Sequence, residues 1–168
     1  MDNVDLEILS LIQNDARVAH ATVGEKLGLT APAVHARIKR LERDGVIRAY
    51  LTSIDALAVN QGLLAFVRVM NSSSGKNENA MEDFLCAQPN ILECHDITGE
   101  DSYLLKIRID SSESLRNLLA KIREFPGVER TVTSIALCTI KESGGPALPP
   151  PSEDGFRRSE NRSRTAKR

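Results

Sequence analysis

Residues 22–43 read TVGEKLGLTAPAVHARIKRLER, and this stretch predicts two helices joined by a tight turn. Gly28 permits the positive φ that ends a helix in a left-handed cap, so the first helix covers about residues 22–27. Thr30 is suited to cap the second helix, and Pro32 is tolerated in its first turn because the N–H groups there lack helical partners. The stretch therefore predicts a helix-turn-helix unit.

The second helix of this pair has an apolar face and a charged face. The apolar face is made of residues at helical spacing, Val34, Ile38 and Leu41. The helix is expected to end at Asp44-Gly45. The opposite face is expected to be exposed and to carry small and positively charged side chains, namely Ala33, His35 or Ala36, Arg37 and Arg40.

This charged face suggests a nucleic-acid contact. Arg and Lys side chains meet the closely spaced phosphates of DNA, while small residues near a helix N-terminus let the helix enter the major groove. We therefore predict that the helix binds double-stranded DNA through Thr30, Ala33, His35, Ala36, Arg37, Lys39, Arg40 and Arg43. The alternative is a solvated helix face with no partner.

Charge has to be assessed locally in this chain of 168 residues. Over its whole length 22 basic residues oppose 23 acidic ones, so the net charge of −1 gives no sign of a polyanionic partner. Three helices are predicted within residues 1–56, the first with Asp2 as its N-cap. This segment carries 7 basic and 8 acidic residues. Affinity for DNA is therefore expected to come from two or more charged helices held in register by an oligomer.

Several classes of protein are excluded or disfavoured. No run approaches the roughly 18 apolar residues of a membrane helix, and the acidic start is unlike a signal peptide, so a cytoplasmic protein is expected. With DNA as its predicted partner, it is expected to be nucleoid-associated. The cysteines are odd in number and widely spaced, which argues against a disulfide framework or a zinc site. Neither a P-loop nor HExxH, GxGxxG or a Ser/His/Asp order occurs, so no catalytic residue, metal or cofactor is predicted.

Residues 63–141 have a different character from the N-terminal unit, from which a polar linker at 57–62 separates them. Strands and helices are expected in the order βαββαβ, the ferredoxin-like pattern, at 63–70, 79–87, 91–98, 103–109, from Asp110 to about 124, and at 128–141. The first strand is apolar on both alternations, with Leu64, Phe66 and Met70 on one side. A sheet with two apolar faces in so small a domain predicts self-association.

The last segment, 142–168, is rich in Pro, Gly, Ser and Arg and contains few apolar residues. Because it has too little apolar surface to offset the entropy of ordering, we expect a disordered tail. Two interpretations stay open. The tail either keeps the protein soluble, or it makes an accessory contact to nucleic acid through Arg157, Arg158, Arg162, Arg164, Lys167 and Arg168.

Several stretches in order resemble the Lrp/AsnC (leucine-responsive, feast/famine) family of transcriptional regulators. They are VDLEILSLIQNDAR from residue 4, LTAPAVHARIKRLERDGVIRAY from 29, ILECHDITGEDSYLLKIRI from 91 and FPGVERTVTSIAL from 125. The resemblance implies an α+β protein with a winged helix-turn-helix over residues 1–56 and a ferredoxin-like "regulation of amino acid metabolism" (RAM) domain over 63–141. It also implies dimers formed through that domain, often assembled into octamers, which bind amino acids or other small metabolites between dimers.

The family places its effector near the loop between the second and third strands of the RAM domain. The family pattern there is Gly-x-x-Asp before an aromatic residue, whereas this chain has Ser102 at the Asp position and Asp101 one position earlier. Gly99 allows backbone N–H groups to approach a carboxylate, and Asp101 or Glu100 is suited to an α-ammonium. Thr131, Thr133 and Ser134 of a neighbouring subunit are further candidates. The alternative is an ordinary turn with solvated acids.

The sequence thus favours a homo-oligomeric, sequence-specific transcriptional regulator that responds to an amino acid or a related metabolite by a shift between assemblies. One alternative is a nucleoid protein that wraps DNA without an effector. Another is an enzyme of the same family, such as a siroheme decarboxylase subunit, for which His95 and Arg108 are the residues that stand out. The intact basic helix argues against the enzyme.

Overall fold

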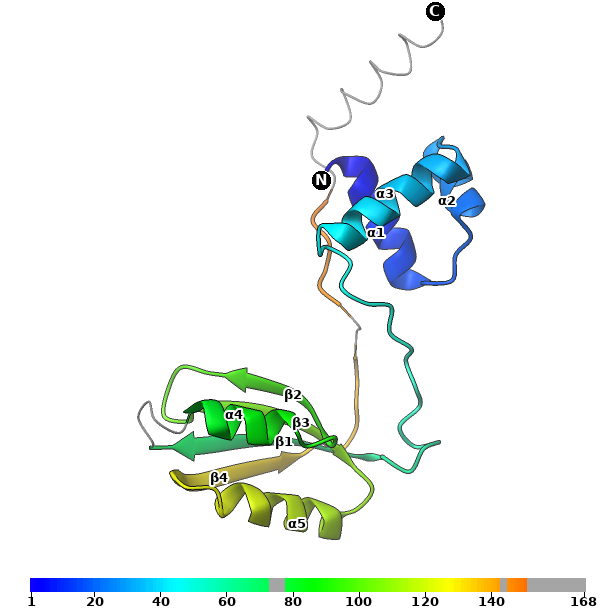
Figure 1. Cartoon of the computed structure of the whole chain (residues 1–168). Coiled ribbons are helices and arrows are strands. Elements are labelled where there is room, and N and C mark those ends of the chain that lie inside the picture. Colours follow the sequence, from blue (N-terminus) through cyan, green and yellow to red (C-terminus); the bar gives the residue numbers. More distant parts are fainter. Residues whose placement is uncertain (73–77, 143–144, 151–168) are drawn as a thin grey trace, which may run out of the picture. The chain divides into compact units, whose positions relative to one another are not determined.

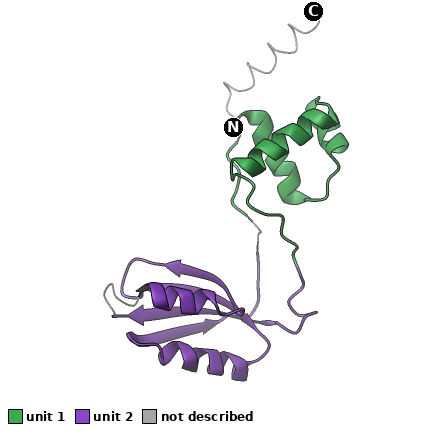
Figure 2. Ribbon diagram, viewed as in Figure 1, with its two compact units in different colours: residues 1–53, 142–168 green, residues 54–141 purple. Residues whose placement is uncertain are grey.

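The structure, a computed structural model, describes residues 1–72, 78–142 and 145–150. The chain divides into two compact units, which are shown in Figure 2. Unit 1 contains residues 1–53 together with 142–168, and unit 2 contains residues 54–141. The predicted disorder of 142–168 lies outside the described residues, apart from Glu142 and residues 145–150.

Unit 1 contains three helices, labelled in Figure 1: α1 (Asn3–Asn14), α2 (His20–Leu27) and α3 (Ala31–Arg43). Gly28 caps α2 with a φ of 66°, and the Thr30 side chain accepts a hydrogen bond from the Ala33 N–H at the start of α3. The helix-turn-helix prediction is confirmed, although α2 begins two residues earlier than expected. Its core is formed by Ile8, Val23, Val34 and Ile38.

The turn between α2 and α3 is packed closely against the backbone of α2. A Cβ added at Gly24 would clash with the carbonyl oxygen of Leu29, and that backbone oxygen has no room to move aside. The Leu29 N–H in turn donates to the Gly24 carbonyl over 2.9 Å. This contact fixes where α3 starts relative to α2.

No wing follows α3. Residues 44–62 are described throughout, and they contain turns but no strand, so the winged form that the family resemblance implied is not observed. The apolar side chains in this segment are largely exposed, for example 85% for Leu51 and 66% for Ile54. A two-stranded hairpin needs a surface to pack against, and these exposed side chains have no such surface.

Unit 2 has the predicted βαββαβ order: β1 (Leu63–Asn71), α4 (Glu78–Cys86), β2 (Ile91–Asp96), β3 (Tyr103–Ile109), α5 (Ser112–Arg123) and β4 (Val128–Ile135). The four strands form an antiparallel sheet in the order β2-β3-β1-β4. Two expected ends are corrected: β2 stops at Asp96, and β4 stops at Ile135 rather than at residue 141. Beyond Ile135 only the Ala136 N–H still bonds to β1, at the Leu64 carbonyl.

The two helices cover one face of this sheet. Alternate residues of β1 and β3 point toward them and are buried with the inner residues of α4 and α5, namely Ala65, Val67, Val69, Tyr103, Leu105, Ile107, Ile109, Met81, Leu85, Leu115, Leu118, Leu119 and Ile122. The N-cap of α5 is Ser111, whose hydroxyl accepts from the Ser114 N–H, so the helix begins at Ser112 and not at Asp110 as expected.

The opposite face of the sheet is mixed rather than apolar. Leu64 is buried, but Phe66 is 39% exposed and Arg68 lies between it and Met70 on the same side of β1. This face is where self-association was predicted, and that prediction remains to be tested. In the described part of the chain, no helix is both long enough and apolar enough to cross a membrane.

Candidate nucleic-acid interface and ligand pocket

The exposed face of α3 is defined by side chains at helical spacing. Those with the greatest exposure are Pro32, His35, Ala36, Lys39 and Arg43, opposite the buried Val34, Ile38 and Leu41. Ala33 is half-buried, and Thr30 sits at the cap. The face is therefore small near its N-terminus and positively charged toward its C-terminus.

Arg37 and Arg40, which the helical pattern placed on this exposed face, point instead toward α1. The Arg37 Nη1 atom lies 2.8 Å from an oxygen of Asp2 and 2.7 Å from one of Asp5. The Arg40 Nη2 atom lies 2.6 Å from Asp5, whose side chain is fully buried. The side chains of Arg37 and Arg40 are only 24% and 42% exposed, which corrects the predicted face at these two positions.

These four residues, Asp2, Asp5, Arg37 and Arg40, form what we call the α1–α3 clamp. A carboxylate out of water requires charged, hydrogen-bonded partners, and Asp5 obtains them from both guanidinium groups. Asp2 and Asp5 also cap α1 reciprocally, each accepting a hydrogen bond from the other's backbone N–H over 2.8–2.9 Å. The clamp thus joins the first turn of α1 to the middle of α3.

The clamp also shifts the pKa of its outer members. Burial by itself would raise the pKa of Asp2, but hydrogen bonds from Arg37 and from the Asp5 N–H, with the charges of Arg37 and Arg40, hold that pKa below its ordinary value. For Arg37, burial opposes the charged form, and its bonds to Asp2 and Asp5 outweigh burial and raise its pKa.

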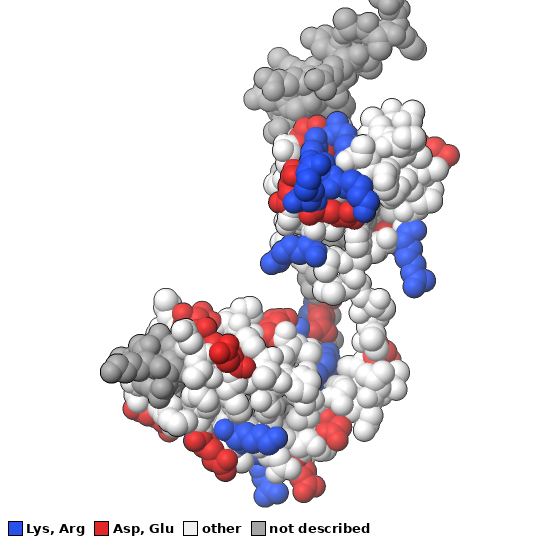
Figure 3. Space-filling view, viewed as in Figure 1, with Lys and Arg blue, Asp and Glu red and all other residues white. Residues whose placement is uncertain are grey.

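The remaining cations of α3 also have partners within the chain. The Lys39 Nζ atom lies 2.8 Å from Glu42, and the Arg43 Nε atom lies 3.5 Å from Asp44. Glu42 also accepts a hydrogen bond from the Tyr50 hydroxyl over 2.9 Å, and the bonds from Lys39 and Tyr50 hold its pKa below the usual value. Figure 3 shows Lys and Arg side chains of unit 1 lying next to acidic ones.

A shallow pocket of about 210 Å³ opens beside the exposed face of α3. It has an apolar floor and a polar rim that includes His20, His35, Lys39 and Tyr50. The rings of His20 and His35 have their centroids 5.3 Å apart. Nothing in the sequence connects His20 with α3, because their contact depends on how α2 packs across that helix.

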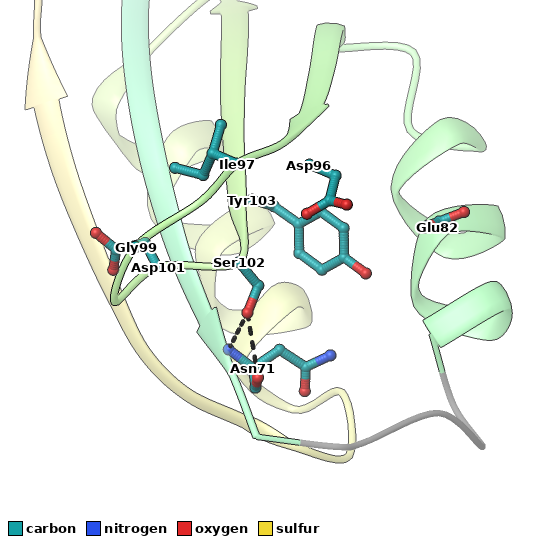
Figure 4. Close-up of a pocket in the computed structure, with 8 residues that line it drawn as sticks. All are labelled: Asn71, Glu82, Asp96, Ile97, Gly99, Asp101, Ser102 and Tyr103. Carbon is teal, nitrogen blue, oxygen red and sulfur yellow. Dashed lines mark hydrogen bonds between the residues drawn. The ribbon is translucent and has the colours of Figure 1, made fainter.

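In unit 2, the loop that joins β2 and β3 is tied to the end of β1 by Ser102. Its N–H donates to the Val69 carbonyl over 2.8 Å, while its hydroxyl donates to the Asn71 carbonyl and accepts from the Asn71 N–H (Figure 4). Gly99 at the tip has a φ of 127°, which strongly favours glycine. Ser102, at the family's Asp position, is therefore part of the loop's backbone framework.

Asp101 is held within its own chain. Its side chain is 10% exposed and lies 3.6 Å from both Arg68 on β1 and Arg130 on β4. Its Oδ1 atom nevertheless has no hydrogen-bond partner. Glu100, also predicted as a ligand, is 86% exposed and 3.7 Å from Arg130. These two arginines could not be assigned to the loop from the sequence, because only the antiparallel pairing of β1 with β4 brings them there.

Part of the predicted effector set comes together at a pocket of about 220 Å³. Gly99, Asp101 and Ser102 line it, together with residues that the sequence did not single out: Asn71, Glu82, Asp96, Ile97 and Tyr103. In Figure 4 the Asp101 carboxylate points toward β4 and away from Asp96 and Tyr103. Asn71, Asp96 and Tyr103 lie at strand ends, whereas Glu82 comes from α4. The spacing of these residues along the sequence therefore could not show that they line one pocket.

The three hydroxyl residues of β4 lie outside this pocket within one chain. The Thr131 hydroxyl accepts a hydrogen bond from Arg123 Nε over 2.8 Å, the Thr133 hydroxyl is buried without a hydrogen-bond partner, and Ser134 is exposed. Their contribution from a neighbouring subunit stays a prediction. Among the described residues, no group of three or more His, Cys, Asp or Glu is placed to hold a metal ion.

The clamp generates a prediction about folding. Replacing Asp5 with Asn leaves the two guanidinium groups without their shared counter-charge, so the free energy of unfolding is expected to fall by about 3–5 kcal/mol. Urea denaturation followed by circular dichroism measures this. Glu25→Gln, an exposed acid on α2, is the matched control and should change the free energy by less than about 0.5 kcal/mol. Equal effects of the two substitutions would contradict the role of Asp5.

The clamp also predicts a pH dependence. Because the pKa of Asp2 is lower in the folded chain than its ordinary value of 3.8, the unfolded chain binds the proton first as pH falls. The stabilisation is therefore complete above about pH 3.8 and is lost as pH falls through the folded-state pKa. Unfolding titrated below about pH 5 should show a shallower loss of stability in Asp2→Asn than in the wild type. An unchanged slope would exclude this linkage.

Comparison with known proteins agrees with this architecture. Residues 1–42 match the AsnC-type helix-turn-helix domain, and residues 64–146 match the Lrp/AsnC ligand binding domain. The chain is 35% identical over 143 residues to the HTH-type transcriptional regulator FL11 of Pyrococcus horikoshii, covering 85% of this chain and 93% of that protein. It is 30% identical over 147 residues to the leucine-responsive regulatory protein of Salmonella typhimurium, covering 85% and 88%.

A solved structure gives the same result for the fold. The transcriptional regulator NMB0573 of Neisseria meningitidis, solved as a complex with L-Met, has a TM-score of 0.81 to this chain at 27% identity. The match covers 86% of this chain and 94% of that one. The resemblance seen in the sequence is thereby confirmed over both units: the chain belongs to the Lrp/AsnC family of DNA-binding transcriptional regulators.

Proposed function

We propose that this regulator reads specific DNA sequences with α3 and responds to an amino acid or related small metabolite bound at the β2–β3 loop. The observation that supports DNA binding by α3 is that its cations fall into two pairs with different surroundings. Arg37 and Arg40 are engaged with buried Asp5, whereas Lys39 and Arg43 remain on the exposed face. The first pair positions the helix, and the second pair is available to phosphates.

The proposed DNA face then consists of small side chains followed by charged ones. Ala33 and Ala36 allow close approach to base edges, and an alanine methyl is suited to contact a thymine methyl group. The ion pairs of Lys39 with Glu42 and of Arg43 with Asp44 lie at the surface, where such pairs are worth about 0–1 kcal/mol. Phosphates can therefore replace these carboxylates at small cost. Thr30 and His35 complete the face.

The proposed effector site is the pocket beside the β2–β3 loop. Its volume of about 220 Å³ is below the usual range of roughly 300–1,000 Å³ for ligand pockets, so it suits a molecule of amino acid size. Gly99 leaves the loop backbone open to a carboxylate, and the Asp96 carboxylate on the pocket lining is suited to an ammonium group, whereas the buried Asp101 Oδ1 lies beside Arg130. The L-Met complex of the Neisseria relative supports this ligand class.

We further propose that the mixed sheet face forms the dimer, and that Ser134, the exposed member of the predicted set Thr131, Thr133 and Ser134, reaches the effector of a neighbouring subunit in a higher assembly. Ligand binding between subunits would then favour one assembly over another, which changes which DNA half-sites are engaged together. The Asp101 pairing with Arg68 and Arg130 connects the loop to that sheet face, because Arg68 and Arg130 belong to it.

The DNA part is tested with duplexes selected from a random pool. Lys39→Ala with Arg43→Ala should weaken binding and reduce the salt dependence by about one unit of slope for each cation removed, because each side chain contacts a phosphate. The matched control is Arg17→Ala with Lys26→Ala, two exposed cations of unit 1 outside α3. A DNA-wrapping protein would instead bind all duplexes alike, whereas a specific regulator prefers its site by about 10³-fold or more.

The effector part is tested by thermal shift with each of the twenty amino acids. A ligand at about 100 times its dissociation constant stabilises the folded chain by about 2.7 kcal/mol, which gives a clear rise in melting temperature. Gly99→Trp should abolish this rise in melting temperature, because the indole ring occupies the space at the loop tip where the ligand is proposed to bind. Ser53→Trp, exposed and outside the pocket, is the control and should retain it. A shift that survives Gly99→Trp would place the ligand elsewhere.

A further inference from the structure

The pocket beside α3 is a cavity of unit 1 and shares no residue with the proposed effector site. Its floor consists of apolar side chains from α1, α3 and the segment between α1 and α2, namely Ile12, Ala16, Val18 and Ile38. Its rim carries His20 of α2, His35, Lys39 and Glu42 of α3, and Tyr50. Because three helices contribute, the pocket forms only when unit 1 is folded, and its volume of about 210 Å³ admits only a small molecule.

Two imidazole rings on the rim of this pocket have hydrogen-bonding groups to spare. The rings of His20 and His35 are tilted by 46° with their centroids 5.3 Å apart, so they contact each other without a hydrogen bond. Among the described residues, neither ring has a hydrogen-bond partner. An imidazole carries at least one N–H group in every protonation state. The pair therefore offers at least two hydrogen-bond donors to a ligand.

The charged groups of the rim favour an anion over a cation. The one carboxylate, Glu42, has its charge balanced by Lys39 at 2.8 Å, and its other oxygen accepts from the Tyr50 hydroxyl over 2.9 Å. An incoming cation has to displace Lys39. An incoming anion instead meets the N–H groups of both imidazoles and the remaining N–H groups of Lys39, whose side chain is 61% exposed.

From these donors and this apolar floor we propose that the pocket binds a small carboxylate with an apolar body, and that this ligand competes with DNA. The carboxylate accepts hydrogen bonds from His20 and His35 beside Lys39, while the body packs on the floor. Because His35 and Lys39 also belong to the proposed DNA face, the ligand occupies donors that α3 offers to phosphates. The competition rests on the proposed function of α3, whereas binding of the carboxylate does not.

Calorimetric titration of the full chain tests the binding, with 4-methylpentanoate as probe and 4-methylpentanamide as its uncharged analogue. The acid should bind at least about tenfold more tightly than the amide, because only the acid makes charge-assisted hydrogen bonds. Ala16→Trp, at an exposed position of the pocket lining, fills the pocket and should abolish binding. Ala21→Trp, exposed on α2 and outside the pocket, is the matched control and should retain it. Gly99→Trp should also retain it.

His20→Gln is a second variant, which removes a donor that is not part of the proposed DNA face. It should weaken binding of the acid by about tenfold and leave binding of the amide unchanged, while circular dichroism checks that the chain is folded. Acid and amide bound with equal affinity, acid binding that survives Ala16→Trp, or no binding of the acid to the wild type would each overturn the proposal. Loss of binding in Gly99→Trp would place the acid at the β2–β3 loop and overturn it as well.

The competition is tested with a DNA duplex at constant ionic strength, with sodium chloride replacing the acid in the reference sample. Saturating 4-methylpentanoate should weaken DNA binding by the wild type and have no effect on Ala16→Trp. Equal DNA affinity of the wild type with and without the acid would overturn the competition. Failure of the proposed function is distinguishable, because Lys39→Ala with Arg43→Ala would then leave DNA binding unchanged, whereas the calorimetric titration contains no DNA.

Discussion

The carboxylate of Asp5 lies in the core of unit 1 and accepts hydrogen bonds from both Arg37 and Arg40. A buried charge must keep its partners, so α3 is fixed in rotation about its axis as well as in position. Rotation decides which side chains face outward, and the clamp turns Lys39 and Arg43 toward solvent. The proposed DNA face of α3 is thus oriented by an ion-pair cluster on the inner side of the helix.

Charged side chains are paired within the chain in unit 2 as well. Asp101 lies between Arg68 and Arg130, and Ser102 uses its hydroxyl to hold the loop to Asn71. The shift of the acidic residue by one position relative to the family pattern therefore changes its partners. Asp101 pairs with cations of its own sheet, which leaves the loop well anchored.

These local arrangements have a common consequence for how the protein meets DNA. Cations that hold α3 in place are not free for phosphates, and the two exposed ones are already paired with neighbouring carboxylates. A single α3 is therefore expected to supply base contacts more readily than strong electrostatic attraction to DNA. An oligomer that joins several helix-turn-helix units is one way to supply the missing charge.

The order of elements, the cap at Thr30, the stop at Gly28, the apolar faces and the family could all be predicted from the sequence, because they depend on local periodicity and backbone preference. The inward orientation of Arg37 and Arg40 could not, since spacing along a helix does not reveal a buried carboxylate 32 to 35 residues away. The positions of Arg68, Arg130 and Glu82 around the β2–β3 loop were likewise missed, and the family pattern implied a wing that residues 44–62 do not form. These points emerge only from the folded chain, because they depend on which side chains meet across helices and strands that are distant in the sequence.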